Sequence, residues 1–302
     1  MNQSHSMNSS ERQAVRKANE ERTVKFPDGT QVPAIGQGTW RMGERPGEKE
    51  KEVKALQLGL ELGMTLLDTA EMYGEGGAEE VTGEAIRGIR DQVFLVSKVY
   101  PHHAGRKSLR KACENSLQRL GTDYLDLYLL HWRGNIPLQE TVDGMEELRK
   151  EGKIARWGVS NFDTDEMKEL WACDGGSRCA TNQVLYHLGS RGIEYDLLPW
   201  MRKEGIPLMA YCPIAQGGLL RQELTTHPTV QSIADAHDVS PIQLILAWSI
   251  RNGDVIAIPK AVQQNHVLDN AKAASIRLSE KQLAQLDQAF PPPDRKVGLD
   301  IV

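Results

Sequence analysis

Three short stretches decide the fold of this chain: residues 65–73 read TLLDTAEMY, residues 93–98 read VFLVSK, and residues 125–131 read LDLYLLH. Each contains an apolar run of strand length, with a polar side chain at its downstream end or just beyond it. A barrel of parallel strands brings the downstream ends of all its strands to one face. The polar side chains that follow these runs are therefore expected to meet in one pocket.

Four of these side chains have complementary chemistry: Asp68, Tyr73, Lys98 and His131. A lysine beside a tyrosine, and itself beside a carboxylate, can make a phenol acidic enough to donate a proton near neutral pH. A neutral imidazole can position a substrate carbonyl or join the proton network of the phenol. Taken singly, Lys98 could reach solvent, Asp68 could cap the next helix, and His131 could be a hydrogen-bonded structural residue.

A repeated pattern extends these runs to most of the chain. From residue 33 onward, a short apolar run, a polar loop and a segment with helical spacing alternate eight times. The predicted strands are residues 34–38, 65–69, 93–98, 125–131, 156–160, 181–185, 207–212 and 255–258. The predicted helices are residues 48–62, 78–90, 108–120, 138–151, 164–171, 195–203, 241–251 and 264–273. Eight alternations predict an α/β fold, a closed (β/α)8 TIM barrel, and no GxGxxG follows the first strand as an open dinucleotide-binding sheet requires.

Other segments are expected to decorate the barrel. The turn sequence Pro27-Asp28-Gly29 lies between two short extended segments and predicts an N-terminal β-hairpin that plugs the lower end. Two extra helices are expected at residues 229–237 and 279–290. The tail, residues 294–302, follows three prolines and is free to lie near the barrel mouth.

The first 22 residues differ from the rest. Residues 1–22 are polar and have little apolar surface to bury, so we expect a flexible N-terminal extension. Within it, Ser10 with Gln13 could cap a short helix. Residues 23–302 are then expected to form a single domain.

Composition favours a small-molecule partner. The chain is 40% apolar and 25% charged with a net charge of −5, so no basic field exists to hold nucleic acid or an anionic membrane. No apolar stretch approaches the roughly 18 to 20 residues that span a bilayer, and the opening segment lacks the apolar core of a secretory signal. We therefore expect a cytoplasmic protein, and a monomer because no long apolar surface stripe is left unassigned.

Cysteine and histidine usage predicts neither disulfides nor a metal site. The cysteines lack CxxC spacing and are expected to be reduced thiols: Cys113, Cys173, Cys179 and Cys212. Near His131 no HxH, HExxH or cysteine pair supplies further ligands, and His102 and His103 are adjacent loop residues.

From about Val24 to the C-terminus, the chain resembles the aldo-keto reductase superfamily. The segments that carry the resemblance are LDTAEMYG, VFLVSK, DYLDLYLLHW, GVSNF, TNQVLYH, AYCPIAQGGL and AIPKA, in the expected order. The segments QGTWRMGE, SKVYPHHAG and NQVLYHLGSRGIEYDLLPW are most similar to the bacterial methylglyoxal reductase type. The resemblance implies metal-free hydride transfer from a nicotinamide cofactor, usually NADPH, to an aldehyde or ketone.

The resemblance also implies residue roles. Tyr73 would donate the proton, Lys98 and Asp68 would lower its pKa, and His131 would orient the substrate. Ser160, Asn161 and Gln183 would hold the carboxamide of the cofactor, and Tyr211 would stack on its nicotinamide ring. From local sequence alone, Ser160 and Asn161 could instead cap the fifth helix, and Tyr211 could be core packing. The residues expected to line the cofactor further are Gly38, Thr39, Trp40, Cys212, Pro213, Ile214, Gln216, Gly217, Leu219, Ile258, Pro259, Lys260, Ala261, His266 and Asn270.

The adenosine end departs from the pattern of the superfamily. Lys260 matches the residue expected to meet a 2′-phosphate, but Ala261 replaces the usual hydroxyl neighbour and His266 replaces the usual arginine. Asp269 stands where a glutamate is usual. A bidentate guanidinium clamp is therefore missing, and NADH use is possible although NADPH is favoured.

The substrate side is expected to be aromatic. Together with Tyr73 and His131, the residues predicted to contact substrate are Trp40, Met72, Tyr100 and Trp132. A largely apolar mouth of this kind suits small aldehydes, although tryptophan on a barrel rim can also be packing. Arg133 and His102 could attract a carboxylate or phosphate, or simply be solvated.

Two other functions remain open at this point. The superfamily also resembles potassium-channel β subunits, which sense nicotinamide while docked to a partner, and such a role needs a docking surface. An unrelated barrel lyase could use Lys98 to form a Schiff base with its substrate.

Overall fold

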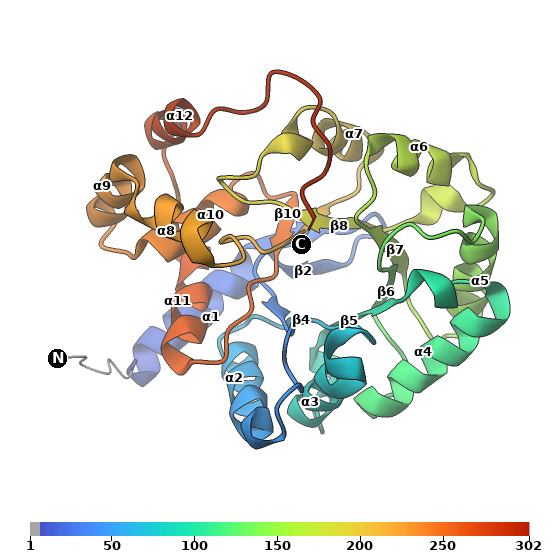
Figure 1. Ribbon diagram of the computed structural model, residues 1–302. Helices are drawn as coiled ribbons and strands as arrows, with labels where there is room; N and C mark the ends of the chain where they lie inside the picture. Colours follow the sequence, from blue (N-terminus) through green and yellow to red (C-terminus); the bar gives the residue numbers. More distant parts are fainter. Residues whose placement is uncertain (1–6, 302) are drawn as a thin grey trace.

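In the computed structural model, which describes residues 7–301, parallel strands lie inside a ring of helices (Figure 1). The eight strands of the main sheet are β3 (Gln37–Gly38), β4 (Leu66–Asp68), β5 (Phe94–Val99), β6 (Leu127–Leu130), β7 (Trp157–Ser160), β8 (Asn182–Leu185), β9 (Leu208–Tyr211) and β10 (Val255–Ala257). They follow one another in chain order across the sheet, and all neighbours are parallel. Parallel neighbours require a crossover after every strand, which is what the helices supply.

The sheet closes between its first and last strands. Ile35 forms a parallel bridge with Ala257, and the N–H of Gly36 donates to the Ala257 carbonyl at 2.8 Å. The predicted first strand is thus divided, because residues 34–36 pair with β10 whereas β3 itself pairs with β4. A Cβ atom on Gly36 would lie 2.9 Å from the Leu66 carbonyl oxygen, so only glycine fits at this seam. The predicted (β/α)8 barrel is confirmed.

The helices that cross between strands match the predicted segments. They are α2 (Lys49–Glu61), α3 (Gly77–Ala85), α4 (Arg106–Leu120), α5 (Leu138–Lys150), α6 (Thr164–Ala172), α7 (Leu197–Glu204), α10 (Pro241–Ser249) and α11 (Gln264–Lys272). The largest difference is in α3, which was expected to reach residue 90. It ends at Ala85, because the backbone of Ile86 (φ −96°, ψ 4°) already leaves the helical conformation, and Gly88, with φ of 83°, is left-handed.

More helices lie outside the strand-helix repeat than the sequence predicted. The two predicted extra helices are present as α9 (Pro228–Ala236) and α12 (Glu280–Ala289). A further helix, α8 (Gly218–Thr226), lies in a segment for which the sequence predicted neither a strand nor a helix. Figure 1 shows α8, α9 and α12 on one side of the barrel, beside α10.

Side-chain alternation along the strands separates two apolar clusters. Leu66, Val96 and Leu129 pack inside the barrel, whereas their chain neighbours Leu67 and Leu95 pack outward against the helices. Successive side chains of a strand point to opposite faces, so each strand contributes to both clusters. The same parity directs the polar residues that end the strands into the barrel interior.

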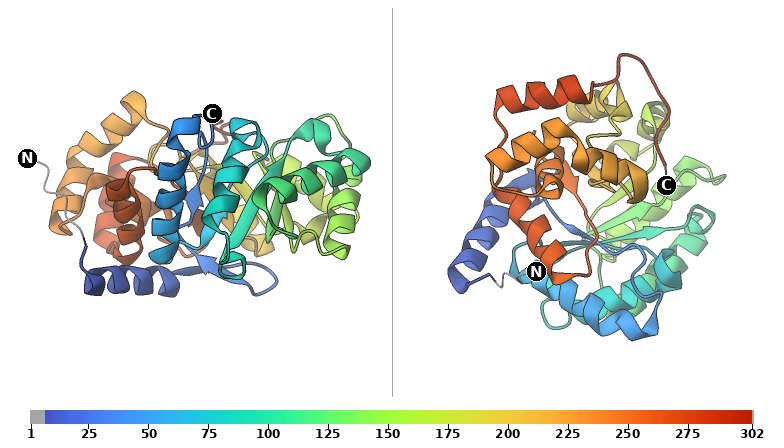
Figure 2. Two further views of the ribbon diagram at one scale, coloured as in Figure 1. Left: turned by 90° about the horizontal axis from the view of Figure 1, so that it is seen from below. Right: turned by 60° about the vertical axis from the view of Figure 1, so that its left-hand side comes forward.

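The predicted hairpin is present as β1 (Thr23–Lys25) and β2 (Gln31–Pro33), which pair antiparallel. Phe26, which lies in the turn of the hairpin, is buried and stacks on Phe94 with ring centroids 5.3 Å apart. Arg156, just before β7, donates to Asp28 at 2.7 Å. Since Phe94 and Arg156 stand at the upstream ends of their strands, the hairpin covers that end of the barrel (Figure 2, left).

The segment before the hairpin is a helix where a loose extension was expected. Helix α1 (Ser9–Glu21) begins with a capping box formed by Asn8 and Glu11 rather than Ser10 and Gln13. Its buried Asn19 donates to the Ala271 carbonyl at 2.9 Å. Polar side chains therefore dock a helix that has little apolar surface. The part of the expected extension that covers residues 1–6 lies outside the described residues.

None of the helices described between residues 7 and 301 combines the length and apolar character that crossing a membrane would take.

We predict that Arg22→Ala lowers the free energy of unfolding by roughly 2 kcal/mol, measured by urea denaturation. The Arg22 guanidinium donates to the carbonyls of Ile276 (2.7 Å), Ile250 (3.2 Å) and Ala274 (3.3 Å), which would lose a charged donor. Arg12→Ala is the matched control, because its pair with Glu61 (3.6 Å) is exposed. Equal stability of the two variants would contradict a docking role for Arg22.

Candidate active site

The three residues predicted to act together do meet. The Lys98 ammonium donates to Asp68 Oδ2 at 2.6 Å, to the Thr69 carbonyl at 2.9 Å and to the Tyr73 hydroxyl at 3.1 Å. Lys98 is fully buried, with Phe94 and Val96 of the same strand facing the same side. Solvent exposure of Lys98 and helix capping by Asp68, the alternatives left open by the sequence, are therefore excluded.

Asp68 is held at both oxygens. Its Oδ1 accepts a hydrogen bond of 2.7 Å from the Gln183 side-chain amide, while Oδ2 accepts from Lys98. Gln183 reaches it from β8 across the barrel interior. The contact was not foreseen, because Gln183 was expected to serve a carboxamide alone. It fixes the carboxylate at the distance from Lys98 that the ion pair needs.

The chain turns sharply just after Tyr73. Gly74, Glu75 and Gly76 all have positive φ, so the segment after Tyr73 folds tightly before α3 begins at Gly77. Glu75 is the costly member, since a residue with a Cβ disfavours this region. The Tyr73 ring packs edge-on against His131, with centroids 5.7 Å apart.

Burial dominates the acidity of Tyr73. It raises the pKa of the phenol above its usual value, and the nearby Lys98 cation opposes the increase without cancelling it. The expected lowering of this pKa is therefore not what the geometry gives, because burial outweighs the Lys98 cation and Asp68 adds to the increase. Tyr73 therefore carries its proton throughout neutral pH.

Lys98 is positively charged, whereas His131 is neutral. Burial disfavours the Lys98 ammonium, but Asp68 and Tyr73 outweigh burial and raise the pKa of Lys98. For His131, burial and then the Lys98 charge lower the pKa to about 2, so the imidazole is neutral. Its Nδ1 is buried and has no hydrogen-bond partner within residues 7–301. The neutral ring borders the large cavity, where the nitrogen other than Nδ1 could exchange a hydrogen bond with a ligand.

A cavity of about 860 Å³ opens at the downstream ends of the strands, and most of the predicted catalytic, cofactor-binding and substrate-binding residues line it. Those that line it are Gly38, Thr39, Trp40, Asp68, Met72, Tyr73, His131, Trp132, Ser160, Asn161, Gln183, Tyr211, Cys212, Pro213, Ile214, Gln216, Ile258, Pro259 and Lys260. The predicted residues that do not line it are Lys98, Tyr100, Gly217, Leu219, Ala261, His266 and Asn270. Lys98 lies behind the wall, in contact with Asp68 and Tyr73.

Polar side chains at the inner end of the cavity are fixed to one another. Asn161 donates to the His131 carbonyl at 3.2 Å and accepts from the Tyr211 hydroxyl at 2.8 Å. Ser160 Oγ donates to the Gln183 carbonyl at 2.7 Å. Neither Ser160 nor Asn161 caps the fifth crossover helix, since Asp163 caps α6 in a capping box. Tyr211 borders the cavity, so the alternative that it serves only to pack the core is also excluded.

The outer end of the cavity carries three cations, of which only Lys260 was predicted. The Arg41 guanidinium lies over the Trp40 ring at 4.5 Å, and Arg221 donates to the carbonyls of Ile214 (3.1 Å) and Ala215 (2.6 Å). Within the described chain, none of these three cations forms a salt bridge with a carboxylate. Arg221 was not predicted, and α8, which carries it, lies in a segment for which no element was predicted.

The residues expected at an adenosine end lie near Lys260 in the chain but outside the cavity wall. His266 is exposed on α11, Asn270 on the same helix is buried, and Asp269 accepts from Gln243 at 3.3 Å. Partial burial lowers the pKa of Lys260, and Glu52, Glu48 and Glu44 oppose that effect. A nucleotide-binding role for His266 and Asn270 stays a prediction.

The aromatic residues predicted to contact substrate lie at the mouth of the cavity or next to it. Trp132 is 37% exposed at the mouth and packs edge-on against Tyr100, with centroids 5.9 Å apart. Tyr100 does not itself line the cavity, so its effect on a ligand would pass through Trp132. His102 does not line the cavity, and its ring packs against Tyr100 at a tilt of 32°, with centroids 4.8 Å apart.

The C-terminal tail also forms part of the wall. Leu299 and Ile301 line the cavity, and Lys296 holds the tail in place by binding Asp196 at 2.9 Å and Asp163. The tail was expected near the barrel mouth, and Figure 2 (left) shows the C-terminus at the end opposite the hairpin. Its ion pairs were not readable from sequence, because the partners are 100 or more residues away.

The cysteines are free thiols. Cys212 borders the cavity, and burial raises its pKa to about 11, so the thiol is protonated at neutral pH. Within the described residues, no three His, Cys, Asp or Glu side chains gather as a metal site would need.

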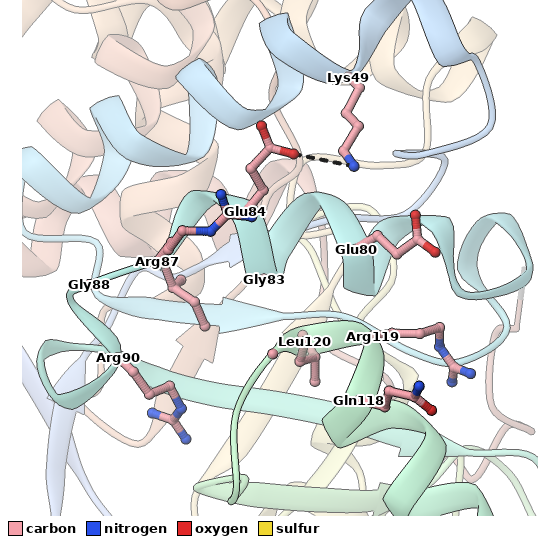
Figure 3. Close-up of a pocket in the computed structure, with 12 residues that line it drawn as sticks. Lys49, Glu80, Gly83, Glu84, Arg87, Gly88, Arg90, Gln118, Arg119 and Leu120 are labelled. Carbon is pink, nitrogen blue, oxygen red and sulfur yellow. Dashed lines mark ion pairs between the residues drawn. The ribbon is translucent and has the colours of Figure 1, made fainter.

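A second hollow of about 680 Å³ lies on the outside of the barrel, between α3 and α4 (Figure 3). Its wall is charged, and its Lys49 and Glu84 pair with each other at 3.2 Å. None of the catalytic candidates borders it, so we place the chemistry in the larger cavity.

The family comparison agrees with the motifs. Residues 34–290 match the model of the aldo/keto reductase family. Methylglyoxal reductase YeaE of Escherichia coli is 55% identical over 283 residues, covering 94% of this chain and all of the relative. Glyoxal reductase of Bacillus subtilis is 35% identical over 279 residues, covering 91% of this chain and 95% of the relative.

Solved structures give the same result. An aldo/keto reductase from Klebsiella pneumoniae in complex with NADP and acetate has a TM-score of 0.91 and 59% identity, covering 93% of this chain and 99% of that one. A Klebsiella pneumoniae aldo-keto reductase in complex with NADPH has a TM-score of 0.90, 60% identity and the same coverage.

We predict that Asp68→Asn lowers the free energy of unfolding by about 3 to 5 kcal/mol, because it leaves the buried Lys98 cation without its anion. Adding Lys98→Met should recover most of that loss, since no buried charge then remains. Urea denaturation of the two single variants and the double variant measures the coupling. Additive losses would show that the pair is not a coupled buried ion pair.

Proposed function

Because this chain belongs to the aldo/keto reductase family, we propose that it reduces small aldehydes, ketones or dicarbonyls, such as methylglyoxal, to alcohols with NADPH. The observation that carries this proposal is the contact of Lys98 with both Tyr73 and Asp68 at the wall of the large cavity. The names of the relatives, methylglyoxal reductase and glyoxal reductase, support the same substrate class.

The cavity suits a nicotinamide nucleotide. Its inner end offers the amide and hydroxyl groups of Ser160 and Asn161 beside the Tyr211 ring, which suit a carboxamide on an aromatic ring. Its outer end offers Arg41, Arg221 and Lys260, which have no carboxylate partner among residues 7–301 and which suit phosphates. When bound, NADPH would supply the hydride.

Tyr73 is proposed as the proton donor. A carbonyl oxygen that gains negative charge as hydride arrives would lie beside the Tyr73 hydroxyl and the neutral His131 ring, both of which border the cavity. Burial keeps Tyr73 protonated until this charge develops. The developing alkoxide is the stronger base, so the proton passes to it from the phenol.

Lys98 and Asp68 are proposed to stabilise the phenolate that this transfer leaves. The Lys98 ammonium donates to the Tyr73 oxygen at 3.1 Å, where the negative charge would appear. Asp68 and Gln183 keep Lys98 charged and in place. The stabilisation therefore acts after the proton leaves and does not require an acidic phenol in the resting enzyme.

Of the two rival functions, Schiff-base chemistry at Lys98 is disfavoured. A Schiff base needs a neutral, accessible amine, whereas Lys98 is fully buried and its pKa is raised, despite burial, by Asp68 and Tyr73. The nicotinamide-sensing subunit role stays an alternative. Rapid turnover of aldehydes by the purified chain, without any partner, distinguishes catalysis from sensing.

We predict that Tyr73→Phe lowers kcat for methylglyoxal by about 100-fold or more, because general acid catalysis contributes on that scale. NADPH affinity, measured by fluorescence titration, should stay nearly unchanged, since only a hydroxyl is removed. An unchanged kcat would refute the proton-donor role.

We also predict that Lys260→Ala raises KM for NADPH about tenfold more than KM for NADH, because only NADPH carries the 2′-phosphate. Lys281→Ala, on the exposed face of α12, removes the same charge away from the cavity and should change neither value. Equal or better KM for NADH in the unmodified enzyme would overturn the preference for NADPH.

A further inference from the structure

The cation nearest the substrate side of the cavity is already engaged. Arg133 follows the aromatic Trp132 at the mouth, and its two terminal nitrogens donate to the two carboxylate oxygens of Glu169 at 2.7 and 2.9 Å. Such a bidentate pair uses the two N–H groups on the edge of the guanidinium by which arginine recognises a carboxylate. The Arg133 charge, which could otherwise attract an anionic substrate, is therefore bound within the protein.

Other charges at this side make the mouth acidic. Asp163 and Glu166 line the cavity, and Lys296, the cation close to them, is shared between Asp163 and Asp196. Near the mouth, then, Arg133 and Lys296 each meet carboxylates, and Glu166 has no cation partner within residues 7–301.

The cofactor side has the opposite arrangement. Arg41, Arg221 and Lys260 line it without a salt bridge to any described carboxylate. In this cavity the cations are unpaired among residues 7–301 where phosphates would lie, and they are paired with carboxylates where substrate would lie. The difference separates the two sides by charge as well as by shape.

Resting on the proposed function, we propose that the substrate is an uncharged aldehyde or dicarbonyl, and that Glu169 enforces this by keeping Arg133 from anionic compounds. A substrate carboxylate would have to displace Glu169 from a bidentate pair and approach Asp163 and Glu166. The proposal concerns a second, charged group on the substrate, not the carbonyl oxygen that Tyr73 would meet.

Methylglyoxal and glyoxylate form a matched pair of probes. Glyoxylate has the heavy-atom skeleton of methylglyoxal with a carboxylate oxygen in place of the methyl group. We expect Glu169→Gln to raise the ratio of kcat/KM for glyoxylate to that for methylglyoxal by about fivefold, the scale of a partly exposed ion pair. Hydration of each aldehyde is the same for every variant and cancels from the comparison.

Two controls isolate Arg133. Asp165→Asn removes one negative charge from the same helix, α6, at an exposed residue paired with Lys168 rather than Arg133, and should leave the ratio unchanged. Adding Arg133→Gln to Glu169→Gln should abolish the gain, because the released cation is then absent. At an ionic strength of about 1 M, screening should reduce the gain.

The outcomes separate the two proposals. An unchanged ratio in Glu169→Gln, or an equal rise in Asp165→Asn, with methylglyoxal still reduced, overturns the role of Glu169 and leaves the proposed function intact. Failure of the unmodified enzyme to reduce any uncharged carbonyl compound overturns the proposed function and this inference with it. Methylglyoxal turnover in each variant verifies that it has folded.

Discussion

The ion pair of Lys98 and Asp68 inside the barrel is the interaction on which the site depends. A fully buried ammonium is tolerated only where an anion and further acceptors surround it. Strand alternation directs Lys98 inward with Val96, and the pairing of β4 with β5 sets Asp68 beside Val96. The register that builds the barrel therefore also sets the charge that would act on Tyr73.

Much of this arrangement was predictable, because it depends on local periodicity. Apolar runs at regular intervals predicted the barrel, and residue parity placed Lys98 inside it. Helix α1 was not predictable in this way. Its docking depends on Asn19 and Arg22, which bond to carbonyl groups 228 to 254 residues away, and a polar residue gives no sign of such a distant partner.

The electrostatics of the site were the least predictable part. Sequence suggested an acidic Tyr73, but whether burial or the neighbouring cation dominates depends on how much water the closed barrel excludes. Likewise, Arg133 read as a free cation until its pairing with Glu169, 36 residues away, was seen. Motifs identified which groups are present, and only the packing determined which of their charges are available.

The seam between residues 34–36 and β10 has a consequence for biosynthesis. The first strand emerges from the ribosome with one edge unpaired, and its partner around Ala257 is translated more than 200 residues later. Until then, the nascent sheet exposes backbone donors that invite pairing with other chains. We therefore expect chaperones to matter most for this protein late in translation, just before the last strand is released.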